Sequence, residues 1–276
     1  MSNSMKDRYG PWALVAGATS GIGRALVEQL ARQGMNLVTV ARTVSKLEAQ
    51  ADSLRSAHGV EVLAVGADLS APDGVDTIIE ATAALEVGLV VPCAAIEHSG
   101  HFVARSAEEH RRMIEMNCVA PMRLAHHFGA RMAARRRGAI LFVSSLSGWM
   151  SQPYMASYGA TKAYVHSLGE ALHQEMKDHG VEVAVLSPGP TDTPMAAETG
   201  IDFASMGMVV MTPDVVARTG LAALGRRANA VPGLRNRMMA FMMTRLVPRG
   251  WVGAMFRWML GRALGIQRDA LPLSTP

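Results

Sequence analysis

The chain has 276 residues, of which 49% are hydrophobic and only 5% aromatic, which suits one large domain of helices packed on a sheet better than a β-sandwich. The net charge is only +4, but ten arginines and no acidic residue lie between Val215 and Arg268, so the basic character is local. The polar first ten residues lack the apolar segment of a signal peptide, no stretch is long enough for a transmembrane helix, and the two cysteines lack metal-type spacing. We therefore expect a cytoplasmic protein without a metal site.

Apolar runs alternate with amphipathic stretches up to about residue 225. The apolar runs occupy 12–16, 37–41, 60–65, 87–92, 139–143 and 181–186. Nearly continuous apolar strands that alternate with helices indicate a parallel sheet covered on both faces. The sequence predicts the starts of two helices. Ser106 with Glu109 forms a capping box, and Thr212-Pro213-Asp214 supplies an N-cap, a first-turn proline and an acid.

A glycine-rich segment, LVAGATSGIGRAL, joins the first predicted strand to the first helix. Gly17, Gly21 and Gly23 have the spacing GxxxGxG. Glycines let backbone N–H groups approach a pyrophosphate at a helix N-terminus, so this segment favours a dinucleotide site over an ordinary turn.

The second predicted strand ends in Ala41-Arg42 without the acid that usually binds the adenosine ribose of NAD. Arg42 suits a 2′-phosphate, Lys46 is a weaker second candidate, and a solvated arginine at a helix start is the alternative. NADP(H) is therefore favoured over NAD(H). After the third strand, Asp68 either reaches the adenine or caps the next helix.

Tyr158 and Lys162 lie four residues apart, so they share one face of a helix. A fixed ammonium group nearby favours the phenolate, which lowers the pKa of a tyrosine from its usual value near 10. A tyrosine and a lysine four residues apart are common and usually structural. This pair therefore indicates catalysis only together with the other motifs of the chain.

With these motifs the chain resembles the classical short-chain dehydrogenase/reductase family. The resemblance is carried by GATSGIG at 17–23, Asn117 in EMNCVAP, Ser145 thirteen residues before Tyr158, YGATK at 158–162 and SPGPTDTPM at 187–195. Each motif is weak alone, but together they are highly specific in order and spacing from about residue 10 to 225.

The resemblance implies a three-layer doubly wound Rossmann-like α/β fold with a central parallel β-sheet, and the amphipathic pattern near the C-terminus adds a helical extension. We expect a single domain over residues 1–276, with a core at about 10–233, a substrate lid at about 190–212 and an amphipathic helical extension at about 234–266. The family commonly forms dimers or tetramers through helices that correspond to 106–134 and 154–179, so a homodimer or homotetramer is implied.

The resemblance also implies a catalytic tetrad of Asn117, Ser145, Tyr158 and Lys162. Tyr158 would act as general acid in reduction and as general base in oxidation, and Ser145 would hold the substrate oxygen. Lys162 would bind the nicotinamide ribose and tune Tyr158, while Asn117 would support a water-linked proton path through its backbone.

Taken together, the expected cofactor-binding residues are Gly17, Thr19, Ser20, Gly21, Ile22, Gly23, Arg42, Asp68, Leu69, Ala94, Tyr158, Lys162, Pro188, Gly189, Thr191 and Thr193. The expected substrate-pocket residues are His98, Ser147 and Met195, and Glu97 is expected to border the same pocket. One departure stands out, because Pro92-Cys93-Ala94-Ala95 occupies the place of the family's Asn-Asn-Ala-Gly beside the adenosine half of the cofactor.

Two further segments are distinctive. Residues 194–211 contain Met195, Met206, Met208 and Met211, which suit either an adaptable apolar lining or ordinary core packing. Two short cationic amphipathic helices are predicted at 237–247 and after Pro248. They either pack on the domain, close over an apolar substrate or lie on an anionic membrane surface, and their interleaved apolar residues argue against nucleic-acid binding.

The leading hypothesis is an NADP(H)-dependent oxidoreductase that interconverts a carbonyl and a secondary alcohol, on an apolar substrate such as an acyl chain, steroid, polyketide or terpenoid. The alternatives are a non-catalytic NADP(H)-binding regulator or scaffold and an epimerisation or dehydration at a bound cofactor. The complete Ser145, Tyr158 and Lys162 set argues against a scaffold.

Overall fold

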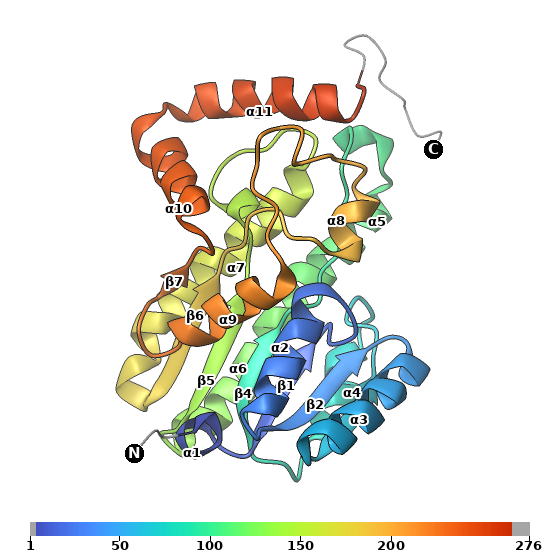
Figure 1. Cartoon of the computed structure of the whole chain (residues 1–276), viewed down its shortest axis with the longest axis vertical. Coiled ribbons are helices and arrows are strands. Elements are labelled where there is room, and N and C mark those ends of the chain that lie inside the picture. Colours follow the sequence, from blue (N-terminus) through green and yellow to red (C-terminus); the bar gives the residue numbers. More distant parts are fainter. Residues whose placement is uncertain (1–3, 267–276) are drawn as a thin grey trace.

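The computed structural model describes residues 4–266, and its centre is a seven-stranded sheet (Figure 1). The strands are β1 (Trp12–Ala16), β2 (Asn36–Ala41), β3 (Val62–Gly66), β4 (Val87–Pro92), β5 (Gly138–Val143), β6 (Val181–Leu186) and β7 (Asn229–Ala230). They pair in parallel in the order β3-β2-β1-β4-β5-β6-β7. This arrangement confirms the predicted Rossmann-like α/β fold, and the two-residue β7 is the strand that the apolar pattern did not predict.

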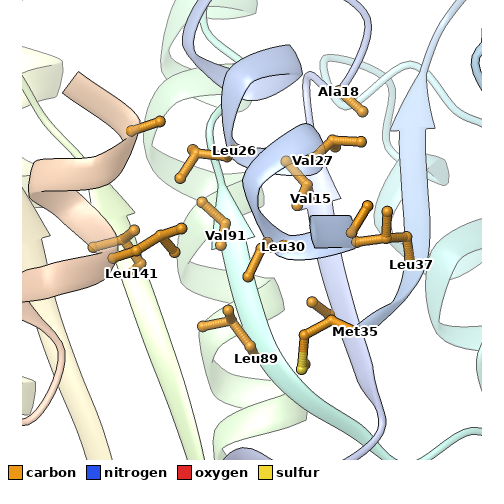
Figure 2. Packing of buried hydrophobic residues seen from close by; sticks show 14 of the residues in the cluster. Val15, Ala18, Leu26, Val27, Leu30, Met35, Leu37, Leu89, Val91 and Leu141 are labelled. Atoms are coloured by element: carbon orange, nitrogen blue, oxygen red, sulfur yellow. The ribbon is translucent and has the colours of Figure 1, made fainter. Parts of the chain in front are cut away.

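Helices cover both faces of the sheet. One core contains residues of α2 (Gly21–Arg32), α3 (Val44–His58) and α9 (Pro213–Ala223), and the other contains residues of α4 (Gly74–Ala81), α6 (Ala120–Ala134) and α7 (Ala156–Glu175). Along β1, Ala13 and Val15 belong to the first core whereas Leu14 and Ala16 belong to the second, as the alternation of side chains in a strand requires. Figure 2 shows Leu26 and Leu30 of α2 packed over the strands in the first core.

The predicted helix starts are confirmed. The Ser106 hydroxyl accepts the Glu109 N–H at 3.2 Å and caps α5 (Ala107–Ile114), and α9 follows Thr212 with Pro213 in its first turn. The helical stretch expected at 106–134 is not one regular α-helix, because a π-helical turn at Glu115–Val119 separates α5 from α6. Such turns often mark functional sites, and this one contains Asn117.

The end of β4 explains why a proline is tolerated in an inner strand. The Cys93 N–H donates to the Ala16 carbonyl oxygen of β1 at 3.1 Å, so the neighbouring Pro92 position faces β5. The β4–β5 pairing ends at Val90, two residues before the proline, while the β1–β4 pairing continues to Pro92. The missing donor of Pro92 therefore lies where no β-ladder bond is needed.

The C-terminal residues form the predicted helical extension. It consists of α10 (Leu234–Phe241), a π-helical turn at Met242–Leu246 and α11 (Arg249–Ala263), which lies across the top of the molecule in Figure 1. Val252, Phe256 and Leu260 of α11 are buried in a third apolar cluster that also contains Tyr158. Within residues 4–266, no helix has both the length and the apolar character needed to cross a bilayer.

The remaining short elements are α1 (Met5–Tyr9), α8 (Pro194–Glu198) and 3₁₀ turns at Phe102–Ala104, Leu146–Gly148 and Lys177–His179. An isolated bridge between Thr191 and Met211 closes the base of the segment that contains α8. Residues 192–210 thus form a loop that leaves the sheet beyond β6 and returns to the start of α9.

Candidate active site

A cavity of about 520 Å³ lies at the carboxyl ends of β1 to β6. This is the edge at which parallel α/β sheets bind their ligands, and the volume falls within the usual range for small-molecule sites. Its lining joins a polar half, made by the loops after the strands, to an apolar half under the C-terminal helices.

Most of the expected site residues line this cavity. They are Gly17, Thr19, Ser20, Gly21, Ile22, Gly23, Arg42, Leu69, Ala94, Ser145, Ser147, Tyr158, Lys162, Pro188, Gly189, Thr191, Thr193 and Met195. Asn117, Asp68 and His98 are not among the residues that line the cavity.

The glycine-rich loop fits a dinucleotide. Gly17 has a φ of +79°, and a Cβ atom there would lie 2.8 Å from the backbone nitrogen of Ala94. A Cβ at Gly23 would lie 2.0 Å from the Gly17 carbonyl oxygen, so neither position admits a side chain. The Ser20 side chain makes no capping hydrogen bond to α2, which leaves the N–H groups of the first turn without that partner. The helix N-terminus is thus suited to an anionic phosphate.

The first loop also explains the small residues after Pro92. Cys93 and Ala94 pass directly beneath Gly17, and Ala94, Ala95 and Ile96 all line the cavity. A larger side chain at Ala94 would compete for the space that the loop and a cofactor need. The side-chain amides that the family has at Pro92 and Cys93 are absent, and the strand end is held by the Cys93 N–H bond to β1.

Arg42 and Lys46 line the cavity where β2 ends and α3 begins. Asp68 does not line it, because its carboxylate accepts hydrogen bonds from the Ser70 N–H at 3.0 Å and the Ser70 hydroxyl at 2.7 Å. Burial tends to raise the Asp68 pKa, but these hydrogen bonds and the nearby Arg42 and Arg112 charges lower it below its usual value. Asp68 therefore carries a negative charge close to Arg42 and shapes the loop before α4.

Tyr158, Lys162 and Ser145 meet at the junction of the two halves of the cavity. Both Tyr158 and Lys162 project from α7, and Lys162 Nζ donates to the Val143 carbonyl oxygen at the end of β5 at 3.0 Å. Ser145 begins the 3₁₀ turn after β5, where its hydroxyl accepts the Ser147 N–H at 3.1 Å. The neighbouring Ser144 hydroxyl donates instead to the Lys162 carbonyl oxygen at 2.8 Å and is buried.

The electrostatics at Tyr158 differ from the expectation for a simple tyrosine–lysine pair. Burial is the largest effect and raises the pKa of Tyr158 well above its usual value, and the nearby Glu97 charge raises it further. A hydrogen bond with Ser145 opposes this shift by favouring the phenolate. Burial lowers the pKa of Lys162. The phenol is therefore protonated at neutral pH.

Asn117 is buried and does not line the cavity. Its amide oxygen accepts the Ile96 N–H at 2.8 Å, and its amide nitrogen donates to the Ile96 carbonyl oxygen at 2.8 Å and to the Thr161 hydroxyl at 3.0 Å. One side chain thus ties the π-helical turn to the segment after β4 and to α7. In this structure the Asn117 side chain holds these three segments together, whereas the role expected from the resemblance was one of its backbone.

Glu97 and His98 lie on different sides of the segment after β4. Glu97 is partly buried and lines the cavity, where burial raises its pKa to about 7 against an opposing effect of the Lys162 charge. His98 lies outside the cavity that holds Tyr158, in a small separate hollow with His101, His110 and Tyr154. His98, which was expected in the substrate pocket, is thus not among the residues that line the cavity with Tyr158.

The loop after β6 forms the side of the cavity nearest the glycine-rich loop. The Leu146 N–H donates to the Pro188 carbonyl oxygen at 2.8 Å, which joins this loop to the segment that carries Ser145. The Thr193 hydroxyl accepts the Ala196 N–H at 3.2 Å and caps α8, and a Cβ at Gly21 would lie 2.8 Å from Thr193 Cγ2. Thr193 therefore lies against the N-terminus of α2.

The apolar half of the cavity combines residues that are distant in sequence. Its members are Met150, Met155, Met195, Phe203, Met206, Met208, Met239, Phe256 and Leu260. The sequence singled out Met195, Met206 and Met208, and it offered an apolar-substrate role for the C-terminal helices as one of three alternatives. It could not identify Met239 of α10, or Phe256 and Leu260 of α11, as cavity residues, although their amphipathic spacing was the available signal.

Comparisons with known proteins agree with this geometry. A family profile described as short chain dehydrogenase matches residues 11–202. The chain is 34% identical to a 7β-hydroxysteroid dehydrogenase of Collinsella aerofaciens over 237 residues, covering 85% of this chain and 90% of the relative. It is 33% identical to a very-long-chain 3-oxoacyl-CoA reductase-like protein of Arabidopsis thaliana, covering 96% of this chain and 84% of the relative.

Solved structures give the same result. A structure of a 7β-hydroxysteroid dehydrogenase superposes with a TM-score of 0.86 at 32% identity, covering 93% of this chain and 99% of that one. A short-chain dehydrogenase from Sphingobium yanoikuyae in complex with NADPH superposes with a TM-score of 0.76 at 31% identity, covering 95% and 98%. The similarity extends beyond the profile match into the C-terminal helices.

Proposed function

The chain belongs to the short-chain dehydrogenase family, and from this premise we propose that it is an NADP(H)-dependent oxidoreductase that interconverts a carbonyl and a secondary alcohol on an apolar substrate. The observation that carries the proposal is the position of Ser145, Tyr158 and Lys162 in the cavity. They lie between the glycine-lined half, which suits a dinucleotide, and the methionine-lined half, which suits an apolar molecule.

The chain's own residues position the substrate and move a proton. A nicotinamide cofactor would supply the hydride when bound. Tyr158, held protonated by burial, donates a proton to the carbonyl oxygen in reduction, and in oxidation its phenolate form accepts the proton of the alcohol. Ser145, whose hydroxyl interacts with the Tyr158 phenol, orients the same oxygen. Lys162, anchored on the Val143 carbonyl oxygen, places a cation beside the phenol and the cofactor ribose.

The preference for NADP(H) rests on the end of β2. Arg42 and Lys46 are the charged side chains on the lining there, and no acidic residue takes the ribose-binding position. The negative charge of Asp68 lies beside Arg42, and its own hydrogen bonds to Ser70 hold it at the loop. The structure of the Sphingobium yanoikuyae relative with NADPH supports the same preference.

The proposed substrate is a bulky apolar ketone or secondary alcohol, with hydroxysteroids as the first class to test. The lining of methionines and aromatic side chains suits an apolar ring system or chain, and methionine adapts well to irregular shapes. The 7β-hydroxysteroid dehydrogenases among the relatives support this choice. We propose that residues 190–212 act as the lid over this half.

The function can be tested by following nicotinamide absorbance with a panel of keto- and hydroxysteroids, 3-oxoacyl thioesters and small polar ketones. Turnover of bulky apolar substrates with NADPH, and little with small polar ketones, is the expected result. Tight NADPH binding without turnover of any substrate would contradict the proposal and favour a non-catalytic regulator.

We also propose that the protein forms a homodimer or homotetramer through α5, α6 and α7, within one domain. Ile114 and Tyr164 on these helices are 48% and 43% exposed, which leaves apolar surface for a second copy. Light scattering on the purified protein tests this assembly, and a monomer at all concentrations would refute it.

A further inference from the structure

The C-terminal helices expose an unusual amount of apolar surface. Seven of the fourteen exposed large hydrophobic side chains in residues 4–266 lie between Leu234 and Ala263. They are Leu234, Met238, Phe241, Met242, Leu246, Trp251 and Trp258, with exposed fractions from 44% to 74%. We call the surface that they form the outer face of α10 and α11.

The spacing of these residues places them in rows. Leu234, Met238 and Phe241 recur at the helical interval along α10, and Trp251 and Trp258 lie two turns apart on α11. The opposite side of α11 is also apolar, because Val252, Phe256 and Leu260 are buried. A helix that is apolar on both sides is expected to be covered on both sides. Within the described residues only the inner side is covered.

The charges on the same segment are of one sign. Between Leu234 and Ala263 there are six arginines, namely Arg235, Arg237, Arg245, Arg249, Arg257 and Arg262, and no acidic residue. All six are exposed, and none forms an ion pair with another described residue. The Arg262 guanidinium lies 5.4 Å from the centre of the Trp258 ring, so charge and aromatic surface are interleaved.

The exposed apolar side chains and the unpaired arginines together distinguish between two binding partners, a second copy of the chain and a lipid bilayer. A symmetric contact with a second copy would set arginines against arginines in a desolvated interface, which is costly. An anionic bilayer surface accepts both groups, because tryptophan and leucine enter the headgroup boundary while arginine side chains reach lipid phosphates. We propose that the outer face of α10 and α11 docks on an anionic lipid bilayer, with both helices lying along the surface.

The inner side of the same helices lines the cavity, which suggests what membrane docking would serve. Met239, Phe256 and Leu260 line the apolar half of the cavity, one helix thickness from the outer face. Figure 1 shows α11 at the top of the molecule, beyond the loop of residues 192–210. A docked protein would thus hold the apolar half of its cavity next to the bilayer, where apolar substrates concentrate. This consequence rests on the proposed function, whereas the docking itself does not.

Flotation of the full-length protein with lipid vesicles tests the proposal. The protein is expected to float with vesicles of phosphatidylcholine and phosphatidylglycerol and to remain in solution with phosphatidylcholine alone. Raising the ionic strength from about 0.1 to about 1 M should release it, because the screening length falls from about 10 to about 3 Å.

Matched variants locate the contact. Replacing both Trp251 and Trp258 by serine, or both Arg257 and Arg262 by glutamine, should weaken partition into the anionic vesicles at least about tenfold. Val44→Ser and Arg32→Gln remove comparable exposed groups from α3 and α2 and should leave partition unchanged. Because the two tryptophans and the two arginines that are replaced are all exposed, circular dichroism and NADPH binding should match the unaltered protein and exclude misfolding.

Three results would overturn the proposal. The first is a failure of the unaltered protein to bind anionic vesicles, and the second is equal binding by the tryptophan variant. The third is lipid-free self-association that disappears in the tryptophan variant while vesicle binding is absent, which would assign the face to a protein interface. Steroid turnover is not used as a readout, so failure of the proposed function would leave this test valid.

Discussion

Lys162 Nζ lies 5.7 Å from the centre of the Tyr158 ring while it donates a hydrogen bond to the Val143 carbonyl oxygen. The lysine is therefore anchored to the end of β5, with its ammonium group near the face of the tyrosine ring. Burial and the Glu97 charge both raise the pKa of Tyr158, so the phenol is protonated at neutral pH.

Removal of the Tyr158 hydroxyl tests its proposed role. Tyr158→Phe should lower kcat by about 10²- to 10⁴-fold, because positioned proton transfer contributes about that much. Binding of NADPH, measured by fluorescence titration, should change little, since the ring remains in place. Tyr164→Phe on the exposed side of the same helix is the control and should retain full activity. Persistent turnover in the Tyr158 variant would refute the assignment.

The choice of cofactor is tested at Arg42. Arg42→Asp should weaken NADPH binding by about ten- to a hundredfold, the loss expected for hydrogen bonds to a charged group, and should weaken NADH binding much less. Arg32→Asp introduces the same charge change on the exposed part of α2 and should affect neither cofactor. Equal losses for NADPH and NADH in the Arg42 variant would count against a 2′-phosphate contact.

Asn117 should contribute more to stability than its single side chain suggests. Asn117→Ala removes three hydrogen bonds and leaves the Ile96 N–H and carbonyl oxygen without their partner, which should lower the free energy of unfolding by about 2–4 kcal/mol. Asn229→Ala is the control, because its bonds to His166 and Glu170 lie nearer the surface, and it should cost less. Urea denaturation of both variants measures the difference. Similar losses would contradict the bracing role.

Much of the fold follows from local sequence signals. Apolar runs predicted six of the seven strands, and the capping residues Ser106 and Thr212 predicted where α5 and α9 begin. These signals are legible because capping and strand burial depend on residues near one another in the chain. β7 has only two residues, so it has no periodicity to detect.

The candidate site also contains residues that local motifs predict and residues that only tertiary packing places. The glycine-rich loop, Ser145, Tyr158 and Lys162 were predicted because motif order and spacing carry them, and the structure brings them to one cavity. The cavity positions of Glu97, Phe256 and Leu260 depend on how an irregular segment and a distant helix pack. No local pattern encodes that packing.

The raised pKa of Glu97 predicts an unusual dependence of stability on pH. Its pKa rises from about 4.5 in the unfolded chain to about 7 in the folded protein, so the folded protein binds the proton more tightly between these values. Stability therefore falls as pH rises through this window, and the unfavourable contribution is complete above pH 7. Glu97→Gln cannot ionise, so the variant should gain up to about 3 kcal/mol relative to the unaltered protein between pH 4.5 and 8.

Denaturant unfolding of the cofactor-free protein at several pH values measures this gain. Glu109→Gln is a matched control with the opposite electrostatics, because hydrogen bonds from the Ser106 backbone N–H, Arg105 and the Ser106 hydroxyl lower the pKa of Glu109 to about 2. That carboxylate is already ionised in the folded protein throughout the window, so the control should show a nearly constant difference from about pH 5.5 upward. If the Glu97 variant also differs by a constant amount, the carboxyl of Glu97 does not titrate in the cavity, because only a group that gains its charge between pH 4.5 and 8 can make the two stability curves diverge there.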